Sequence, residues 1–296
     1  MAGLKEIRTR INSIASTQKI TSAMKMVSAA KFHKAQDTFF RFKQYSNKVD
    51  EVLQQVASTA HDPSVSKWFK KQKNTRNIAL VVLSSNSSMC AGFNQNLAKK
   101  IVEDGAKTLG SAWGTDGLTI FGLGKKGADI LSKKGISINL TDSEITISPN
   151  FDDTASFCEQ HILTPFNDGT YDAVYIAYNE FRNPAVQVPT IIQYLPYKLP
   201  EGIEKSSNES DNFVFEPNRE DILKVIIPMA LKTSFYELIL ENSIGEHGAR
   251  MTAMHQATEN AIELSKQLKL QYNKARQAAI TKEILEIVSG AEALRG

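Results

Sequence analysis

Cysteine and long apolar runs are scarce in this chain of 296 residues. Its two cysteines, Cys90 and Cys158, are too few and too far apart for a disulfide framework or a zinc site. No apolar run approaches the length that crosses a bilayer, and residues 1–10 lack the apolar core of a signal peptide. We therefore expect two buried, inert thiols, no metal, and a protein made and kept on the cytosolic side.

Glycine and proline are also absent from two long stretches, residues 4–57 and 249–289. Strong helix formers fill most of the second stretch, which predicts a helix too long for a compact domain. A helix of this kind needs a partner, because most helical stability in water comes from packing an apolar face. Its apolar and small residues alternate in steps of three and four, typical of a coiled-coil seam, through Met251, Met254, Thr258, Ala261, Ser265, Leu268, Tyr272, Ala275 and Ala279.

The first stretch supplies the expected partner. It has its own helical periodicity, through Leu4, Ile7, Ile11, Ile14, Met24, Val27, Phe39, Phe42, Val49, Val52, Leu53 and Val56.

The predicted fold class is therefore α/β plus a long antiparallel α-helical coiled coil. Residues 1–60 and 218–296 are expected to form the two shaft helices, and residues 61–217 a Rossmann-like α/β domain with its linkers inserted between them. The segment 61–63 would end the first helix, and Asn218 would cap the second. Pro228 should kink the second helix or mark its start, and Gly245 and Gly248 are further weak points. The alternative is two helices packed on one large domain.

Strand and helix patterns alternate in the middle of the chain, which predicts an open α/β sheet. The expected strands are 78–83, 118–121, 136–140, 173–178 and 186–194, and the expected helices are 94–109, 128–134 and 154–163. A polar connection at 70–74 and a linker at 196–212 would join this domain to the shaft.

Acidic residues are almost absent near the amino terminus. Up to Lys34 the chain has seven lysines and arginines and only one acid, Glu6. Such a helix is drawn to an acidic surface. Nucleic acid is the weaker candidate, because stacking aromatics are absent before Phe32 and no binding motif accompanies the charge. An acidic protein partner and a plain solvated face both stay open.

One motif suggests an enzyme. Gly122, Gly124 and Gly127 form a G-x-G-x-x-G sequence between a predicted strand and a predicted helix, and Asp142 follows about twenty residues later. In dinucleotide sites such glycines let the backbone approach a pyrophosphate, and the acid binds a ribose hydroxyl. An NAD(P)-binding oxidoreductase is therefore the alternative function, and a tight turn that needs glycine is the plain interpretation.

Other catalytic patterns are weaker. The chain has no phosphate-binding P-loop, no nucleophile elbow and no H-E-x-x-H. His255 and Glu259 lie one helical turn apart, but two residues do not make a metal site. Serines 84, 85, 87 and 88 follow the first strand and could form an anion nest, although a solvent loop is the better interpretation.

Several specific strings at both ends resemble the gamma subunit of the F-type ATP synthase. At the amino end they are Lys5-Glu6-Ile7-Arg8, Thr17-Gln18-Lys19-Ile20-Thr21, Ala23-Met24 and Met26-Val27. At the carboxyl end they are Ala249-Arg250-Met251, Ala253-Met254, Ala257-Thr258, Asn260-Ala261, Tyr272-Asn273-Lys274-Ala275-Arg276-Gln277 and Ile280-Thr281-x-Glu283-x-x-Glu286-x-x-x-Gly290-Ala291. The loop at 85–92 departs from the family's Ser-Asp-Arg-Gly-Leu-Cys-Gly-Gly, which puts that loop's family contacts in doubt.

The resemblance implies a non-catalytic rotor shaft with no cofactor of its own. Its partners would be three alpha and three beta subunits, the epsilon subunit and the membrane ring of c subunits, on the cytoplasmic side of a bacterial inner membrane. Proton flow would turn the shaft and so drive ATP synthesis or hydrolysis in the ring of alpha and beta subunits. Expected contacts with that ring are Lys19, Met24, Lys25, Arg276, Gln277 and Thr281. A purely structural coiled-coil protein is the third possibility.

Overall fold

A computed structural model describes residues 2–57, 67–69, 75–197, 216 and 219–293. The expected helix end at 61–63, the polar connection at 70–74, most of the linker at 196–212 and the Asn218 cap lie outside these residues. The chain divides into two compact units, Met1–Ala29 with Arg250–Gly296, and Ala30–Ala249. We call them the tip unit and the sheet unit.

Two very long helices dominate the element order. The helix α1 spans Ala2–Ala57, and α8 spans Arg219–Ala293. The helix α8 continues through Pro228 and through both glycines, so it does not start at the proline. The fold class expected from the sequence, two long terminal helices with an α/β segment between them, is confirmed.

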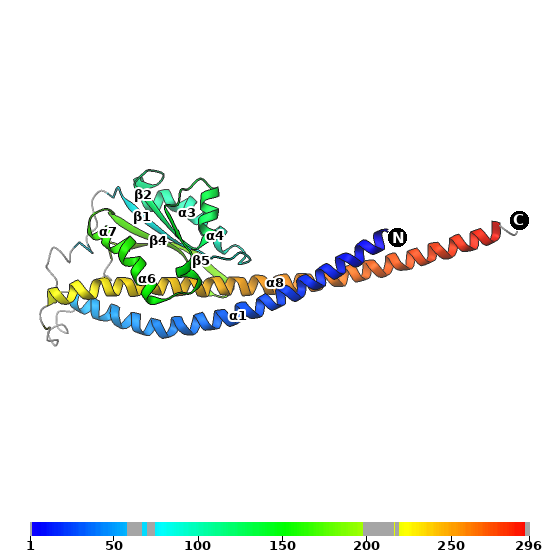
Figure 1. The fold of residues 1–296 in the computed structure, drawn as a ribbon, viewed down its shortest axis with the longest axis horizontal. Helices are drawn as coiled ribbons and strands as arrows, with labels where there is room; N and C mark the ends of the chain where they lie inside the picture. Colours follow the sequence, from blue (N-terminus) through cyan, green and yellow to red (C-terminus); the bar gives the residue numbers. More distant parts are fainter. Residues whose placement is uncertain (1, 58–66, 70–74, 198–215, 217–218, 294–296) are drawn as a thin grey trace. The chain divides into compact units, whose positions relative to one another are not determined.

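The sheet unit contains a five-stranded sheet in the order β3-β2-β1-β4-β5 (Figure 1). The first four strands are parallel and β5 is antiparallel to β4. The strands are β1 Ile78–Leu83, β2 Leu118–Leu123, β3 Leu140–Asp142, β4 Ala173–Asn183 and β5 Val186–Leu195. The helices between them are α3 Phe93–Leu109, the 3-10 turn η1 Gly110–Ala112, α4 Lys125–Lys133, α5 Glu144–Ile147, α6 Phe151–Cys158, the π-helix η2 Glu159–Leu163 and α7 Thr164–Asn167.

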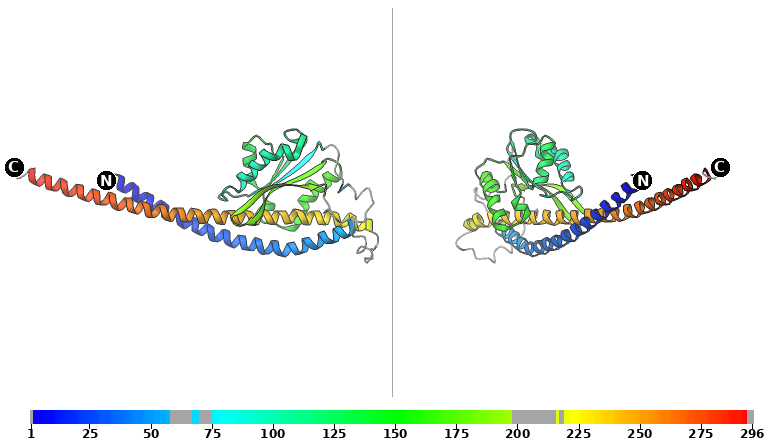
Figure 2. Two further views of the ribbon diagram at one scale, coloured as in Figure 1. Left: turned by 180° about the vertical axis from the view of Figure 1, so that it is seen from behind. Right: turned by 45° about the vertical axis from the view of Figure 1, so that its right-hand side comes forward.

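The sheet is buried on both faces, as parallel strands require. Alternate residues of β1 point to opposite sides. Ala79, Val81 and Leu83 join a core with α6, η2 and the sheet-unit parts of α1 and α8, whereas the even-numbered residues join a core with α3 and α4. Figure 2 shows the ribbons of the sheet unit from two further directions. The sheet therefore lies between two helical layers.

The predicted third strand was misplaced. Residues 136–140 were expected to form it, but β3 begins at Leu140. After α4, the Ile136 N–H donates to the Leu131 carbonyl oxygen at 3.1 Å, and Ile136 and Ile138 pack on the α3/α4 side of the sheet. The alternating apolar residues thus belong to a helix-ending loop rather than to a strand.

The sheet-unit parts of α1 and α8 run antiparallel. Lys43 forms an ion pair with Glu237, and the rings of Phe42 and Tyr236 meet edge to face at 4.8 Å. Gly248 lets α8 approach the β4–β5 turn closely, since a Cβ at position 248 would lie 3.1 Å from Pro184 Cα in that turn. The expected weak point is a packing site.

In the tip unit the seam of α8 is confirmed. Met254, Ala261 and Leu268 are buried, and the six other predicted seam residues are half-buried. Opposite them, Leu4, Ile7, Ile11 and Ile14 of α1 are half-buried.

The α1 seam was wrong at one position. Val27 is 57% exposed, and the small polar residues Thr21 and Ser28 are buried instead. The Thr258 hydroxyl lies 2.9 Å from the Thr21 hydroxyl across the seam. This part of the coiled coil therefore has a polar contact within its seam and apolar side chains on its outer face.

Candidate functional site

The glycine motif forms the turn between β2 and α4, and a protein side chain fills it. Gly124 has φ +110°, and a Cβ there would lie 2.3 Å from the Ser84 carbonyl oxygen. A Cβ on Gly127 would lie 2.5 Å from Ser84 Oγ. Ser84 is fully buried, donates to the Gly124 carbonyl oxygen at 2.9 Å and accepts from the Gly127 N–H at 3.1 Å. The glycines therefore admit Ser84, at the end of β1.

The other groups that would bind a dinucleotide are also engaged. The Lys125 N–H donates to Asn86 Oδ1 at 3.1 Å, and the Lys126 N–H to the Ser85 carbonyl oxygen at 3.0 Å. Asp142 Oδ1 accepts from the Glu144 N–H at 2.9 Å. A pyrophosphate needs free amides at the amino end of the helix, and here the first three are bonded within the protein. The oxidoreductase alternative is not supported.

The serine-rich loop after β1 does not form an anion nest, and the expectation of a solvent loop is wrong for Ser84 and Ser85, which are buried. Ser85 is buried, and its N–H donates to Asn94 Oδ1 at 3.0 Å. Asn86 donates to Thr146 Oγ1 at 2.7 Å and to the Ser143 carbonyl oxygen at 3.0 Å, which ties the loop to α5. Met89 and Ala91 have φ +67° and +49°, in the left-handed region that glycine prefers. In this chain, which departs from the family pattern, internal hydrogen bonds therefore hold the loop in place. The side chains on its outer surface are uncharged.

The two cysteines are buried, as expected. Burial raises the pKa of the Cys158 thiol to about 12, although its hydrogen bond with Tyr194 at 3.8 Å acts in the opposite direction. A thiol with that pKa is protonated and unreactive at neutral pH.

No metal cluster of three or more His, Cys, Asp or Glu side chains occurs among the described residues. His255 Nδ1 lies 4.0 Å from Glu259 Oε1 and 3.2 Å from Lys25 Nζ. A lysine ammonium beside the imidazole is a poor neighbour for a cation. The pair is an ordinary helix-surface contact, as the sequence favoured.

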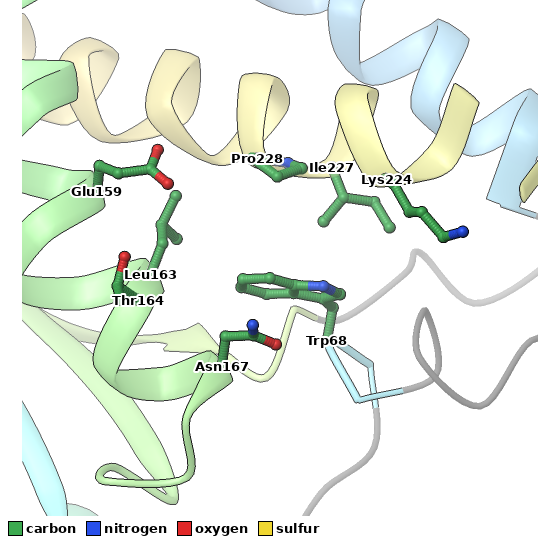
Figure 3. A pocket seen from close by; sticks show the side chains of 8 residues that line it. All are labelled: Trp68, Glu159, Leu163, Thr164, Asn167, Lys224, Ile227 and Pro228. Atoms are coloured by element: carbon green, nitrogen blue, oxygen red, sulfur yellow. The ribbon is translucent and has the colours of Figure 1, made fainter. Parts of the chain in front are cut away.

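A cavity of about 330 Å³ lies in the sheet unit beside the first turns of α8 (Figure 3). The Trp68 ring faces Leu163, Ile227 and Pro228 across it. Glu159, the one acid among the described lining residues, forms an ion pair with Lys232. The cavity thus lacks a convergent set of reactive groups, and none of the six predicted contact residues lines it.

The six predicted contact residues all lie in the tip unit, in two separate places. Lys19 is exposed, whereas Met24 and Lys25 are half-buried toward α8. Arg276, Gln277 and Thr281 are exposed, and the Thr281 hydroxyl donates to the Gln277 carbonyl oxygen at 3.0 Å.

The structure does not bring these two groups together. Because Thr21 pairs with Thr258, Lys19 is level with about residue 260 of α8. Arg276 lies about 16 residues further along, which is roughly 24 Å at 1.5 Å per residue.

The sequence analysis did not identify two exposed apolar patches as candidate binding surfaces. The α1 patch consists of Ile20, Met26 and Val27, which are 57–64% exposed. The tail patch lies in residues 280–293 of α8, all of which are exposed; its large apolar residues are Ile280, Ile284, Leu285, Ile287 and Val288. A signal was available, because apolar residues on both sides of one helix indicate two partners.

Unneutralised positive charge lies on the same helix as the α1 patch, next to it at Lys19 and further toward the amino end. Lys5, Arg8, Arg10 and Lys19 have no ion-pair partner among the described residues. In the tip unit α8 reaches beyond the start of α1 (Figure 1). The tip unit therefore combines a basic face with apolar surface that this chain does not cover.

Comparisons with known proteins agree over the whole length. A family profile described as ATP synthase matches residues 3–294. The ATP synthase gamma chain of Flavobacterium psychrophilum is 44% identical over 297 residues and covers 100% of both chains. The ATP synthase gamma chain of Cytophaga hutchinsonii is 43% identical over 299 residues and covers 99% of both. The chain belongs to the ATP synthase gamma chain family.

Solved structures share the fold at low sequence identity. A chain of the Euglena gracilis mitochondrial ATP synthase superposes with a TM-score of 0.67 at 19% identity, over 99% of this chain and 95% of that one. A chain of the Tetrahymena thermophila central stalk and c-ring superposes with a TM-score of 0.58 at 21% identity, over 80% of this chain and 99% of that one. The resemblance of the terminal strings to the gamma family is confirmed. Among the described helices, none is long and apolar enough to cross a membrane.

Proposed function

We propose that this chain is the central rotor shaft of an F-type ATP synthase. Its tip unit would stand inside a ring of three alpha and three beta subunits, which hold the catalytic sites. The observation that supports this best is the tail patch. An α-helix that exposes five large aliphatic side chains over residues 280–293 needs surrounding protein to cover them in water.

The proposed division of labour follows the predicted domain boundaries. Residues 1–60 and 218–296 provide the shaft, and residues 61–217 provide the domain that binds the epsilon subunit and the membrane ring of c subunits. The protein would be peripheral, on the cytoplasmic side of a bacterial inner membrane.

Coupling in this proposal is mechanical. In the tip unit α8 pairs with α1 over part of its length and then continues without it. The unit is therefore asymmetric about its long axis. Rotation then presents a basic, apolar or bare face to each beta subunit in turn. A differential contact of this kind shifts each catalytic site between conformations, because a partner biases an equilibrium only by binding its two states unequally.

Six residues are proposed to make those contacts. Lys19 projects from the basic face of α1, and Met24 and Lys25 border the seam beside it. Arg276 and Gln277 project from α8 just before the tail patch, and Thr281 lies at its start. Lys25 would need to leave His255 to reach a partner carboxylate.

The test is to purify the tagged chain from its native membranes and assay the eluate for ATP hydrolysis. We expect alpha and beta subunits in the eluate and ATPase activity. A variant with Ile284→Asp and Ile287→Asp should lose the alpha and beta subunits, since charges would replace the apolar side chains that the ring covers. Lys134→Asp, at an exposed position after α4 and outside the tail patch, serves as the charge control. A chain that elutes alone, or variants that retain the ring, would contradict the proposal.

A further inference from the structure

The outer face of α1 within the sheet unit has a regular arrangement of cations. Lys34, Arg41 and Lys48 follow one another at seven-residue intervals and are all exposed. Seven residues are close to two helical turns, so the three side chains form one ridge, about 10 Å apart and about 21 Å long.

Acids on the same helix offset part of this charge, because the exposed Asp37 lies one turn from both Lys34 and Arg41, and Glu51 pairs with Lys48. Lys48 lies 2.9 Å from Glu51, but Lys34 and Arg41 have no ion-pair partner among the described residues. An exposed pair such as Lys48 with Glu51 is worth little, so Lys48 is available to a better partner.

An aromatic ring flanks the ridge on each side. The Phe40 side chain is 56% exposed and the Tyr45 side chain is 45% exposed. At 100° per residue Phe40 and Tyr45 diverge by about 140°, with Arg41 between them. Phe40 contacts Phe39 at 5.7 Å between ring centroids, which leaves its outer surface bare.

We propose that this face, Lys34, Phe40, Arg41, Tyr45 and Lys48, binds an acidic amphipathic helix of another subunit of the rotary complex. The cation spacing determines the form of the partner. A helix running along α1 repeats its side chains at the same seven-residue interval, so carboxylates at i, i+7 and i+14 meet all three cations. Apolar side chains beside those carboxylates cover the two rings, which are the anchors that such interfaces favour.

The inference rests on the proposed function, because it assumes a multi-subunit complex. It adds a second binding surface, in the sheet unit, with a partner of defined chemistry. The six residues proposed to contact the ring all belong to the tip unit.

The experiment places a photo-crosslinking benzoylphenylalanine at position 40 of the full chain, expressed in its native membranes. The crosslinked peptide is then identified by mass spectrometry. We expect a helical segment with acidic residues at seven-residue spacing. Arg41→Glu together with Lys34→Glu should lower the crosslink yield about five-fold or more, since each reversal replaces an attraction with a repulsion. Lys134→Glu, an exposed lysine after α4, should leave the yield unchanged.

The outcomes separate the two proposals. If the chain elutes without an ATPase ring, the proposed function fails. If it elutes with the ring but position 40 gives no crosslink, a lipid adduct, or a segment without acidic residues, only this inference is overturned. Equal crosslink yield in the charge-reversed variant would also overturn it, and circular dichroism of the variant establishes that α1 has remained helical.

Discussion

Ala91 occupies a backbone conformation in which a side chain costs free energy. Its φ of +49° lies in the left-handed region, where a Cβ crowds the following carbonyl oxygen. The side chain is exposed and no packing gain offsets the strain. The loop is nevertheless held in place, because Ser85, Asn86 and Asn94 bind it from inside.

Ala91→Gly should therefore raise the free energy of unfolding, by about 0.5 kcal/mol once the greater freedom of glycine in the unfolded chain is subtracted. The matched control is Ala106→Gly, at an exposed position within α3, where the same change should cost about 1 kcal/mol. Urea unfolding of both variants measures the difference. Equal destabilisation by the two substitutions would show that position 91 is not strained.

Gly124 combines two constraints that can be measured separately. Gly124→Ala should destabilise the protein by about 3 kcal/mol, since the methyl group meets the Ser84 carbonyl oxygen and the positive φ adds strain. Gly135 also has a positive φ, +80°, but a Cβ there meets nothing within 4 Å. Gly135→Ala should cost only the strain, about 1 kcal/mol. Thermal unfolding of both variants tests this, and similar losses would mean that Ser84 moves aside.

Glu241 makes stability depend on pH. Burial raises the pKa of its carboxyl, the nearby Glu180 and Glu237 add to the rise, and the Phe181 N–H bond opposes it. The folded state therefore holds this proton more tightly than the unfolded state, in which the pKa of a glutamate carboxyl is about 4.3. As pH rises through the interval between the two values, this group's contribution to stability falls, and the loss is complete above the folded value.

Glu241→Gln should accordingly stabilise the protein at pH 8 and have a smaller effect at pH 4, where the carboxyl is mostly protonated in both states. Glutamine keeps the oxygen that accepts from Phe181 at 3.0 Å. Denaturant midpoints at the two pH values measure the effect, with exposed Glu283→Gln as the control. A gain that is the same at both pH values would point to packing rather than charge.

At the scale of elements, the long helices were predictable because two stretches lack glycine and proline, and the α8 seam because its small and apolar residues keep one spacing. The α1 seam was harder. Ile20, Met26 and Val27 have the periodicity of a core face, but periodicity cannot say whether a partner helix or another subunit covers it. The glycine motif was ambiguous for a similar reason, since a turn that admits Ser84 needs the same residues as a turn that admits a phosphate.

Leu268 and Leu270 test the seam of the tip unit. Leu268 is 7% exposed and Leu270 is 64% exposed, although they are two residues apart on one helix. Leu268→Ala should cost about 2–3 kcal/mol of local stability, and Leu270→Ala less than about 0.5 kcal/mol. Hydrogen exchange of the amides in residues 4–29 and 250–279 reports this directly. If both variants exchange alike, α1 is not the partner of this face.

At the scale of the whole molecule, the proposed contacts of Arg276 and Gln277 can be separated from folding. Both side chains are exposed, so Arg276→Ala with Gln277→Ala should leave the helix content unchanged. In the assembled complex it should lower ATP-driven ion pumping several-fold relative to ATP hydrolysis, because transmission and not catalysis is affected. Gln95→Ala with Lys99→Ala on α3 is the matched control. Undiminished pumping by the Arg276 and Gln277 variant would remove these residues from the interface.

Ser84 has a consequence for how the machine tolerates its surroundings. Its hydroxyl occupies the place that a phosphate takes in dinucleotide-binding folds. A side chain of the sheet unit therefore fills the turn that a ligand would fill in those folds. A domain that binds a nucleotide gains stability only in proportion to how much of that nucleotide is free. This domain has no such dependence. A rotor built on such a turn does not gain or lose stability there as the concentration of free ATP changes.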